Sequence, residues 1–359
     1  MSTETNQNPS TSVPEPEVLV RRAGHLGHLI LNRPKALNSL THGMVQTVRD
    51  TLEQWREDSD VATVLISGAG EKGLCAGGDV VSLYRAAVDG RPEVGDAFFA
   101  DEYAMNALIA DYPKPYVAFM DGIVLGGGVG ISAHGNQRIV TERTRLGMPE
   151  TGIGFFPDVG GAWLLSRAPA GFGHHLGLTS SHVTGADALA LGFADHFVDS
   201  SRLAELATTL EATGAEEAIA AVAASGAAEP ESPLMQHQAW IETAYAEDTA
   251  EGIVAALTSS GDPAAAEAAA AILAKSPTSV KITLELIRRA AQMSTVHEVL
   301  DQDATVAHHL LRGHDMREGI RAQLVDKDRN PQWNPRALED VPTDAVTSAF
   351  DPVAAQARN

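Results

Sequence analysis

Cysteine is almost absent from this sequence of 359 residues, since Cys75 is the one cysteine that it contains. A single thiol cannot form an internal disulfide, which fits a reducing compartment. A lone cysteine is more often a small buried residue than a nucleophile, and Cys75 is interpreted in that way. No Cys/His spacing typical of metal ligands occurs, so neither a metal nor a separate cofactor is predicted.

Basic residues are also few. The chain has 26 Lys and Arg against 47 Asp and Glu, and its formal net charge is −21. A protein this acidic repels nucleic acid and anionic membranes, so neither is expected as a partner. Any anionic ligand would have to be held by a local cluster of donors.

Long apolar runs are missing as well. No run reaches the ~18 residues that a membrane-spanning helix needs. The first 16 residues, MSTETNQNPSTSVPEP, contain no Lys or Arg, which argues against a secretory signal and against a mitochondrial presequence. They are predicted to be a disordered tail, and the protein is predicted to be cytoplasmic.

Strand and helix patterns alternate over the first 200 residues. Strands are expected within 18–31, 61–67, 115–120, 137–141 and 145–148, and helices over 41–57 and from about 128. Gly-rich turns follow the strands, which predicts an α/β fold with its site on loops at strand ends. The expected organisation is a tail over 1–16, a core with the active site over 17–200, a mainly helical region over 201–340, and a loose tail over 341–359.

Two glycine motifs follow strands. In CAGGD (75–79), paired glycines let the backbone approach a ligand closely and leave the Gly78 N–H free to face a cleft. In DGIVLGGGVG (121–130), three glycines lead into a helix, which exposes N–H groups where negative charge can develop. The second motif lacks the Gly-Lys-Ser/Thr of a phosphate loop and the acidic partner of a dinucleotide fingerprint. Each motif alone is also compatible with a plain turn or with close packing.

Two further motifs carry charged side chains. In MPETGIGFFPDVGG (148–161), Glu150 and Asp158 flank an apolar stretch, and carboxylates beside apolar side chains tend to have raised pKa values that suit acid–base work. In RPKALN (33–38), basic side chains beside a turn could hold phosphates. The alternatives are a helix cap or an ion pair for each acid, and a solvated loop for the basic segment.

In this order and at these distances, the four motifs resemble those of the crotonase (enoyl-CoA hydratase/isomerase) superfamily, and most closely its branch that hydrolyses 3-hydroxyisobutyryl-CoA. The similarity runs from about Val18 to Pro335 and includes SPTSVKITLELI and RGHDMREGIRAQLVDKDRNPQWNP. The resemblance implies a spiral of ββα units with a C-terminal helical region, an acyl-CoA substrate, and a possible trimer or hexamer.

The resemblance also implies a site. The N–H groups of Gly78 and Gly127 would form an oxyanion hole for the thioester carbonyl. Glu102 matches a substrate-binding glutamate of the hydrolases, although locally it could be a surface helix residue. The coenzyme A groove would be lined by Lys35, Ala36, Leu37, Ala76 and Asp79, with Lys35 near the phosphates.

The hydratases of the superfamily use two glutamates. In this sequence the position of the first glutamate is Gly130, and the position of the second is Glu150. At position 158, where such hydratases typically have a glycine, this sequence has Asp158. Hydrolase-like members show this same exchange, so hydrolysis of a short 3-hydroxyacyl-CoA is predicted, with Glu150 as nucleophile or base and Asp158 as substrate-binding or proton-relaying group. That reaction would belong to valine breakdown. The alternatives are a hydratase or isomerase with a relocated acid, and a non-catalytic acyl-CoA-binding protein.

Overall fold

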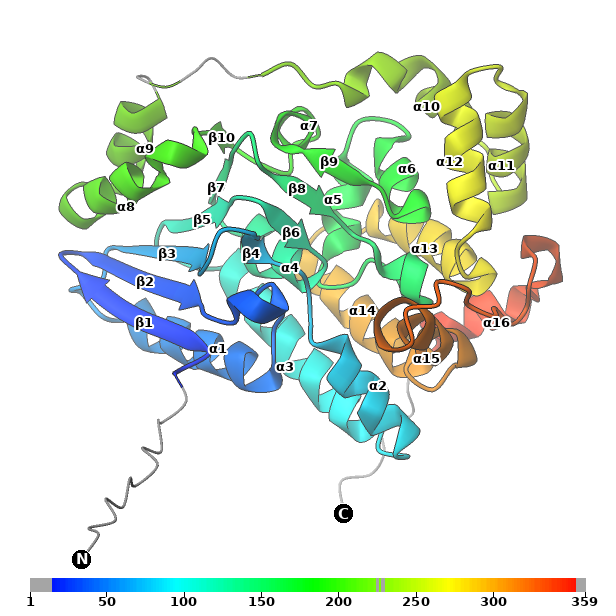
Figure 1. Ribbon diagram of the computed structural model, residues 1–359, viewed down its shortest axis with the longest axis horizontal. Coiled ribbons are helices and arrows are strands. Elements are labelled where there is room, and N and C mark those ends of the chain that lie inside the picture. Colours follow the sequence, from blue (N-terminus) through cyan, green and yellow to red (C-terminus); the bar gives the residue numbers. More distant parts are fainter. Residues whose placement is uncertain (1–14, 224–225, 227–229, 353–359) are drawn as a thin grey trace, which may run out of the picture.

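The computed structural model describes residues 15–223, 226 and 230–352 (Figure 1). Most of the predicted N-terminal tail and residues 353–359 lie outside the described residues. The strands of the described part are β1 Val18–Ala23, β2 Leu26–Leu31, β3 Thr63–Gly68, β4 Gly73–Cys75, β5 Tyr116–Met120, β6 Ile123–Leu125, β7 Gln137–Val140, β8 Arg145–Gly147, β9 His182–Thr184 and β10 His196–Phe197.

Helices make up most of the remaining described chain. The α-helices there are α1 His42–Arg56, α2 Val80–Val88, α3 Glu93–Ala110, α4 Gly127–Ala133, α5 Gly161–Arg167, α6 Phe172–Thr179, α7 Gly185–Ala190, α8 Leu203–Ala212, α9 Ala215–Ala223, α10 Gln238–Ala244, α11 Ala250–Ser259, α12 Pro263–Leu273, α13 Pro277–Ala290, α14 Val296–Leu310, α15 His314–Ile320 and α16 Thr343–Thr347. Shorter helical turns include η1 Pro34–Ala36, η2 Glu150–Ile153, η5 Arg321–Val325, which is π-helical, and η7 Ser348–Phe350.

The strands form two sheets that the chain visits in turn. The six-stranded sheet has the order β1-β2-β3-β5-β7-β10 and the four-stranded sheet the order β4-β6-β8-β9. From β3 onward the chain places one strand in the first sheet, the next in the second sheet, and then a helical segment, three times in succession. The predicted α/β spiral of ββα units is therefore confirmed.

Both faces of β3, a central strand of the six-stranded sheet, are covered, which explains its apolar run Val64–Ile66. Val64 and Ile66 of β3 pack into the core cluster that includes α1 and α3. Leu65 points the other way, into a second cluster with Leu206 and Leu210 of α8 and with α9. The chain beyond residue 200 thus supplies one layer of this sheet, although its composition alone indicated no role.

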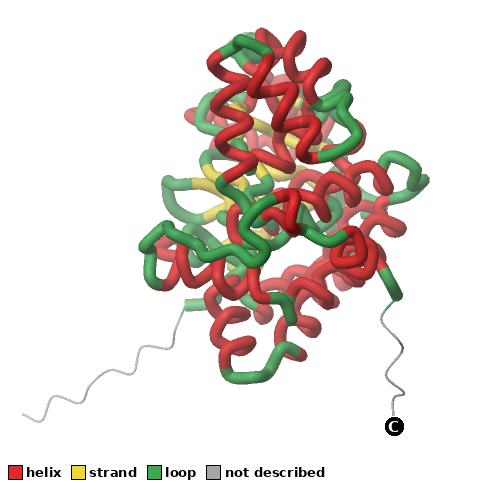
Figure 2. Tube along the Cα trace, turned by 90° about the vertical axis from the view of Figure 1, so that its right-hand side faces the viewer, coloured by secondary structure: helices red, strands yellow, loops and turns green. Residues whose placement is uncertain are grey.

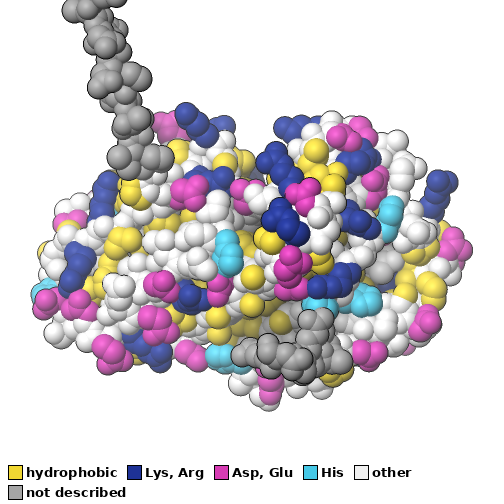
Figure 3. Space-filling model, turned by 90° about the horizontal axis from the view of Figure 1, so that it is seen from below, with side chains coloured by type: hydrophobic (Ala, Val, Ile, Leu, Met, Phe, Trp, Pro, Cys, Tyr) yellow, Lys and Arg dark blue, Asp and Glu magenta, His cyan; other side chains and the backbone are white. Residues whose placement is uncertain are grey.

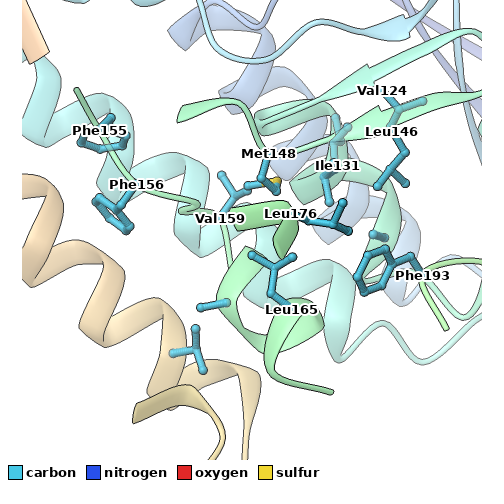
Figure 4. Packing of buried hydrophobic residues seen from close by; sticks show 14 of the residues in the cluster. Val124, Ile131, Leu146, Met148, Phe155, Phe156, Val159, Leu165, Leu176 and Phe193 are labelled. Atoms are coloured by element: carbon cyan, nitrogen blue, oxygen red, sulfur yellow. The ribbon is translucent and has the colours of Figure 1, made fainter. Parts of the chain in front are cut away.

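A large apolar core joins the four-stranded sheet to the helices around it. In Figure 4, Val124 of β6 and Leu146 of β8 lie close to Ile131 of α4 and Leu176 of α6. Helices enclose the strands on the side shown in Figure 2. None of the helices within the described residues is long and apolar enough to cross a membrane.

The structure differs from the sequence-based expectation in two places. First, α2 and α3 were not predicted, although α3 spans 18 residues. Second, the predicted loose tail over 341–359 is helical as far as the structure describes it, through α16 and η7. Its order has a physical cause, because Ala349 is fully buried and the Arg289 guanidinium lies 4.1 Å from the centroid of the Phe350 ring.

Candidate active site

Three of the predicted motifs meet at one edge of the four-stranded sheet. Strands β4, β6 and β8 are neighbours and run parallel. The CAGGD turn follows β4, the triple-glycine turn follows β6, and Glu150 follows β8. Parallel neighbours end at the same edge, so segments that are far apart in sequence come together there.

A cavity of about 560 Å³ opens at this edge. Most of its walls come from the three turns, from α3 and from the C-terminal helical region. The residues that line it are Ala76, Gly77, Gly78, Val80, Phe98, Phe99, Glu102, Leu125, Gly126, Pro149, Glu150, Gly152, Ile153, Phe155, Asp158, Ser180, Ala274, Lys275, Gln323, Leu324, Arg329 and Pro331.

The two predicted oxyanion-hole residues lie beside each other. A Cβ built on Gly127 would stand 3.3 Å from the Gly78 nitrogen. The CAGGD turn is held by bonds from Leu40 N to the Gly77 carbonyl oxygen (2.9 Å) and from Asp79 N to the Leu40 carbonyl oxygen (2.8 Å). Neither bond uses the Gly78 N–H, while Gly127 opens helix α4, where N–H groups have no partner within the helix.

The triple-glycine turn also makes room for two carboxylates. A Cβ on Gly126 would lie 2.3 Å from Glu150 Oε1, and one on Gly127 would lie 2.6 Å from Glu102 Oε1. Gly126 has φ +50°, a backbone conformation that residues with side chains rarely adopt. The absence of side chains at these two positions therefore leaves the space that the two carboxyl groups occupy.

Asp158 is the third acid of the cavity and is only 4 % exposed. The Tyr103 hydroxyl donates a hydrogen bond of 2.9 Å to Asp158 Oδ2. The Tyr103 ring stacks on Phe99 with centroids 5.6 Å apart, and Phe99 stacks on Phe155 at 5.3 Å. An aromatic wall thus holds Asp158 in place and keeps its surroundings apolar.

The three carboxyl groups share one poorly solvated volume, which shifts their pKa values upward. Burial raises the pKa of Glu102 and of Glu150 well above the usual range, and in both cases the Asp158 carboxylate raises it further. Burial likewise raises the pKa of Asp158 to about 7, against the opposing effect of the hydrogen bond from Tyr103. One Glu102 oxygen and one Glu150 oxygen have no hydrogen-bond partner among the described residues. These oxygens are free to meet a ligand.

Position 130 has no room for a side chain. A Cβ on Gly130 would lie 2.6 Å from Val159 Cβ and 2.9 Å from Asn106 Nδ2. A glutamate there would collide with residues that pack against α4, so the first acid of the hydratase pair cannot be accommodated at this position without rearrangement.

The RPKALN segment lies next to the cavity but enters it less than predicted. The Leu37 carbonyl oxygen accepts a hydrogen bond from Ala76 N at 3.0 Å, which joins the segment to CAGGD. Asp79 caps α2 and pairs with Arg33 at 3.2 Å. Of the predicted groove residues, Ala76 lines the cavity; Lys35, Ala36, Leu37 and Asp79 do not. The predicted contacts of these four with coenzyme A stay predictions.

Several residues in or around the cavity were not found by sequence reasoning. Tyr103, which bonds Asp158 from behind the cavity wall, adjoins the predicted Glu102, and Glu102 itself is buried rather than on the surface, because α3 packs inward. The missed lining residues before position 200 include Val80, Phe98, Phe99 and Ser180. Those after position 200 are Ala274, Lys275, Gln323, Leu324, Arg329 and Pro331. They belong to or adjoin segments of the quoted family resemblance, but local sequence gives no sign that these segments border the site.

Cys75 is buried, and burial raises the pKa of its thiol to about 12, so the interpretation as a packing residue is confirmed. Among the described residues no cluster of three or more His, Cys, Asp or Glu side chains is suited to hold a metal ion.

Comparison with known proteins identifies relatives over nearly the whole chain. Residues 26–350 match the family model described as enoyl-CoA hydratase/isomerase. A mitochondrial 3-hydroxyisobutyryl-CoA hydrolase from Gallus gallus is 40% identical over 345 residues, which cover 94% of this chain and 89% of the relative. The corresponding Homo sapiens protein is 38% identical over 342 residues, with 93% and 88% covered.

Two solved structures resemble the fold closely. A carnitinyl-CoA dehydratase from Mycobacterium thermoresistibile gives a TM-score of 0.89 at 49% identity, covering 94% of this chain and 97% of that one. An enoyl-CoA hydratase from Rhodobacter sphaeroides 2.4.1 gives 0.88 at 38% identity, covering 94% and 98%.

Proposed function

This chain belongs to the enoyl-CoA hydratase/isomerase family, and on that premise we propose that it hydrolyses the thioester of a short 3-hydroxyacyl-CoA, with 3-hydroxyisobutyryl-CoA as the first candidate substrate. The relatives from Gallus gallus and Homo sapiens bear that name. Release of 3-hydroxyisobutyrate would place the reaction in valine breakdown.

One observation carries the proposal. Glu102, Glu150 and Asp158 lie in the same cavity as Gly78, whereas Gly130 lies against Val159 and Asn106 without space for a carboxylate. A hydratase of this family positions water between two glutamates, one of which would occupy position 130. The carboxylates present here suit attack on a carbonyl carbon and protonation of a departing group.

The proposed mechanism uses each group at a stated atom. The N–H groups of Gly78 and Gly127 bind the thioester oxygen, and a single donor of this kind typically contributes about 3 kcal/mol to lowering the barrier. Once ionised, Glu150 either attacks the carbonyl carbon and forms an anhydride that water then hydrolyses, or takes a proton from the water that attacks. The carbon–sulfur bond breaks, and the departing thiolate receives a proton. The net reaction is hydrolysis of the thioester by one water molecule, which gives the free acid and coenzyme A.

Asp158 is suited to supply that proton. With its pKa raised to about 7, its carboxyl group is partly protonated at neutral pH. Glu102 lies beside Gly127 and has one oxygen without a partner among the described residues, so we assign it to binding the 3-hydroxyl group. No separate cofactor takes part in this scheme, because coenzyme A is a portion of the substrate.

A second candidate function is hydration or dehydration at a double bond. It is favoured by the similarity to the solved structures titled carnitinyl-CoA dehydratase and enoyl-CoA hydratase. It would require an acid other than residue 130, and Asp158 or Glu102 would have to take that role.

The test measures both reactions with the same protein. Thiol release from 3-hydroxyisobutyryl-CoA is followed beside loss of the double bond from crotonyl-CoA and its formation from carnitinyl-CoA. Rapid thiol release without hydration or dehydration supports the hydrolase. Hydration or dehydration without thiol release overturns it in favour of the second candidate, and no turnover at all favours an acyl-CoA-binding protein.

We further propose a cytoplasmic location and a homo-oligomer of three or six chains. The single cysteine fits a reducing compartment, although the relatives from Gallus gallus and Homo sapiens are described as mitochondrial. Cell fractionation tests the location, and light scattering of the purified protein tests the oligomer.

A further inference from the structure

The cavity contains two cations that the proposed chemistry does not use. Among the described residues that line it, Lys275 and Arg329 are the only Lys or Arg, beside the three acids already discussed. The chain as a whole carries a net charge of −21, and side chains of both signs are interspersed on the face shown in Figure 3. Attraction for an anionic substrate must therefore come from local cations of this kind.

Lys275 is held in a defined place on the cavity wall. The preceding residue, Ala274, accepts a hydrogen bond of 3.1 Å from Trp333 Nε1, and the following residue, Ser276, donates one of 2.6 Å to Asp315 Oδ2. A Cβ built on Gly152 would lie 3.8 Å from Lys275 Nζ and 3.7 Å from Ser180 Oγ. The ammonium group and this hydroxyl thus converge on one spot, next to the turn that carries Glu150.

Arg329 reaches the same cavity from a segment that crosses its rim. We call residues 321–333 the rim segment; it begins with η5, which contacts α2, and it follows α15, which lies beside α2 in Figure 1. Lys327 and Arg329 have φ +58° and +54°, and Arg329 N donates to the Ala322 carbonyl oxygen at 3.0 Å. Left-handed backbone at residues other than glycine is costly and often marks functional sites.

Within the described part of the chain, neither cation lies beside a counter-ion. Among the described residues no ion pair or side-chain hydrogen bond is made by Lys275 or Arg329. Burial lowers the pKa of Lys275, and no carboxylate offsets that effect. A partly buried ammonium group without an anion is unfavourable, and an anionic ligand would relieve it.

We propose that Lys275 and Arg329 form a binding subsite for an oxyanion that the substrate carries away from its thioester carbonyl. The oxyanion is either a phosphate of coenzyme A or a carboxylate at the far end of the acyl group. The inference rests on the proposed function only in taking the ligand to be an acyl-CoA. It assigns a binding role to the region after residue 200, in place of the predicted Lys35, which is exposed and does not line the cavity.

The test measures, by titration calorimetry, the equilibrium binding of four ligands that lack a thioester. Coenzyme A is compared with pantetheine, which has no phosphate at either end, and S-(3-carboxypropyl)-pantetheine with S-butyl-pantetheine. The proteins are the unaltered chain, Lys275→Met, Lys275→Arg and Arg329→Gln. Lys327→Met is the matched control, because Lys327 belongs to the same rim segment, has the same left-handed backbone and does not line the cavity.

The expected result is a selective loss. Lys275→Met and Arg329→Gln each weaken binding of either coenzyme A or S-(3-carboxypropyl)-pantetheine roughly tenfold, as expected for loss of a charged hydrogen bond. Binding of the matching neutral ligand, pantetheine or S-butyl-pantetheine, stays unchanged. Lys275→Arg retains the affinity. Loss for coenzyme A identifies the phosphate, and loss for the carboxypropyl ligand identifies an acyl carboxylate.

Two results would overturn the subsite. One is that Lys275→Met and Arg329→Gln bind each of the four ligands as tightly as the control Lys327→Met does. The other is equal weakening for charged and neutral ligands, which would mean that the two side chains act through packing. Because none of the ligands can be hydrolysed, failure of the proposed hydrolase activity would not affect this outcome.

Discussion

Glu150 and Asp158 are the same kind of functional group in two different settings. Among the described residues Glu150 Oε2 has no hydrogen-bond partner, and Glu150 Oε1 lies against the space that Gly126 leaves open. Asp158 accepts a hydrogen bond from Tyr103 behind an aromatic wall. The Glu150 carboxyl group therefore keeps an oxygen that a ligand can reach, and the Asp158 carboxyl group is fixed in position by Tyr103, a division set by their surroundings.

The role of Glu150 can be tested with the Glu150→Gln variant. Its amide can neither attack nor accept a proton, so thiol release should fall about 10²–10⁴-fold while the fold is retained. Steady-state kinetics measure the loss, and circular dichroism checks folding. Glu142→Gln is the control, because Glu142 bonds Ser200 at the surface. Equal rates for both variants would remove Glu150 from the mechanism.

The raised pKa of Asp158 also predicts a dependence of stability on pH. Its pKa is about 7 in the folded chain and near 4 when unfolded, so the folded state binds more protons between these values. Stability linked to this group is fully present below pH 4 and is lost as pH rises through 7. Asp158→Asn should therefore raise the melting temperature by roughly 2–5 °C at pH 8 and change it little at pH 4.

Thermal unfolding at both pH values provides the measurement. The neutral amide can still accept the hydrogen bond from Tyr103, so loss of that contact does not complicate the comparison. A variant that is less stable than the unaltered chain at pH 8 would show that Asp158 is not held against an electrostatic penalty.

At the scale of elements, the short strands β4, β6 and β8 order the site. Each spans three residues, and the turn after each one delivers a functional group to the same edge. Helix α4 packs so closely behind this edge that Gly130 meets Val159. The spacing between α4 and the Asp158 turn therefore depends on the absence of a side chain at position 130.

Gly130→Ala should consequently destabilise the protein. The added methyl group would lie 2.6 Å from Val159 Cβ, and overpacking of this kind costs about 1–3 kcal/mol. Gly214→Ala is the matched control, since a Cβ there meets nothing within 4 Å. Urea denaturation compares the two free energies of unfolding. An unchanged value for Gly130→Ala would mean that the site can expand enough to accept a hydratase glutamate.

At the scale of the whole molecule, the chain after residue 270 closes the cavity formed by residues up to Ser180. Asp315 joins the parts of this region, because its carboxylate accepts from Ser276 Oγ at 2.6 Å and from Asn334 N at 2.9 Å. The two bonds fix the wall that carries Lys275 relative to the segment that carries Arg329.

Asp315→Ala should lower the free energy of unfolding by about 2–3 kcal/mol, because Ser276 and Asn334 lose a charged acceptor. Asp326→Ala, which removes an exposed partner of Arg321, should have little effect. Urea denaturation gives both values, and limited proteolysis shows whether residues 321–333 become accessible. Similar stability of the two variants would deny Asp315 this joining role.

Local patterns predicted much of this molecule. The strand pattern of 61–67 became β3 Thr63–Gly68 and the helix pattern of 41–57 became α1 His42–Arg56, because apolar periodicity reflects which faces are buried. Helix α3 was missed because apolar and polar residues are mixed around it. The three-residue strands β4, β6 and β9 were missed because they are too short to show a period, whereas β8, of the same length, was predicted. The buried position of Glu102 could not be predicted, since burial depends on what packs against a helix.

The sequence by itself determined the order of the motifs, the family, the missing acid at position 130 and the presence of Glu150 and Asp158. These follow from residue identity and local spacing. Only the tertiary structure decided that Gly130 has no space for a side chain, that Tyr103 holds Asp158, and that Lys275 and Arg329 border the site. Those features depend on contacts between segments up to about 250 positions apart, and such contacts are set by how the sheets and helices pack together.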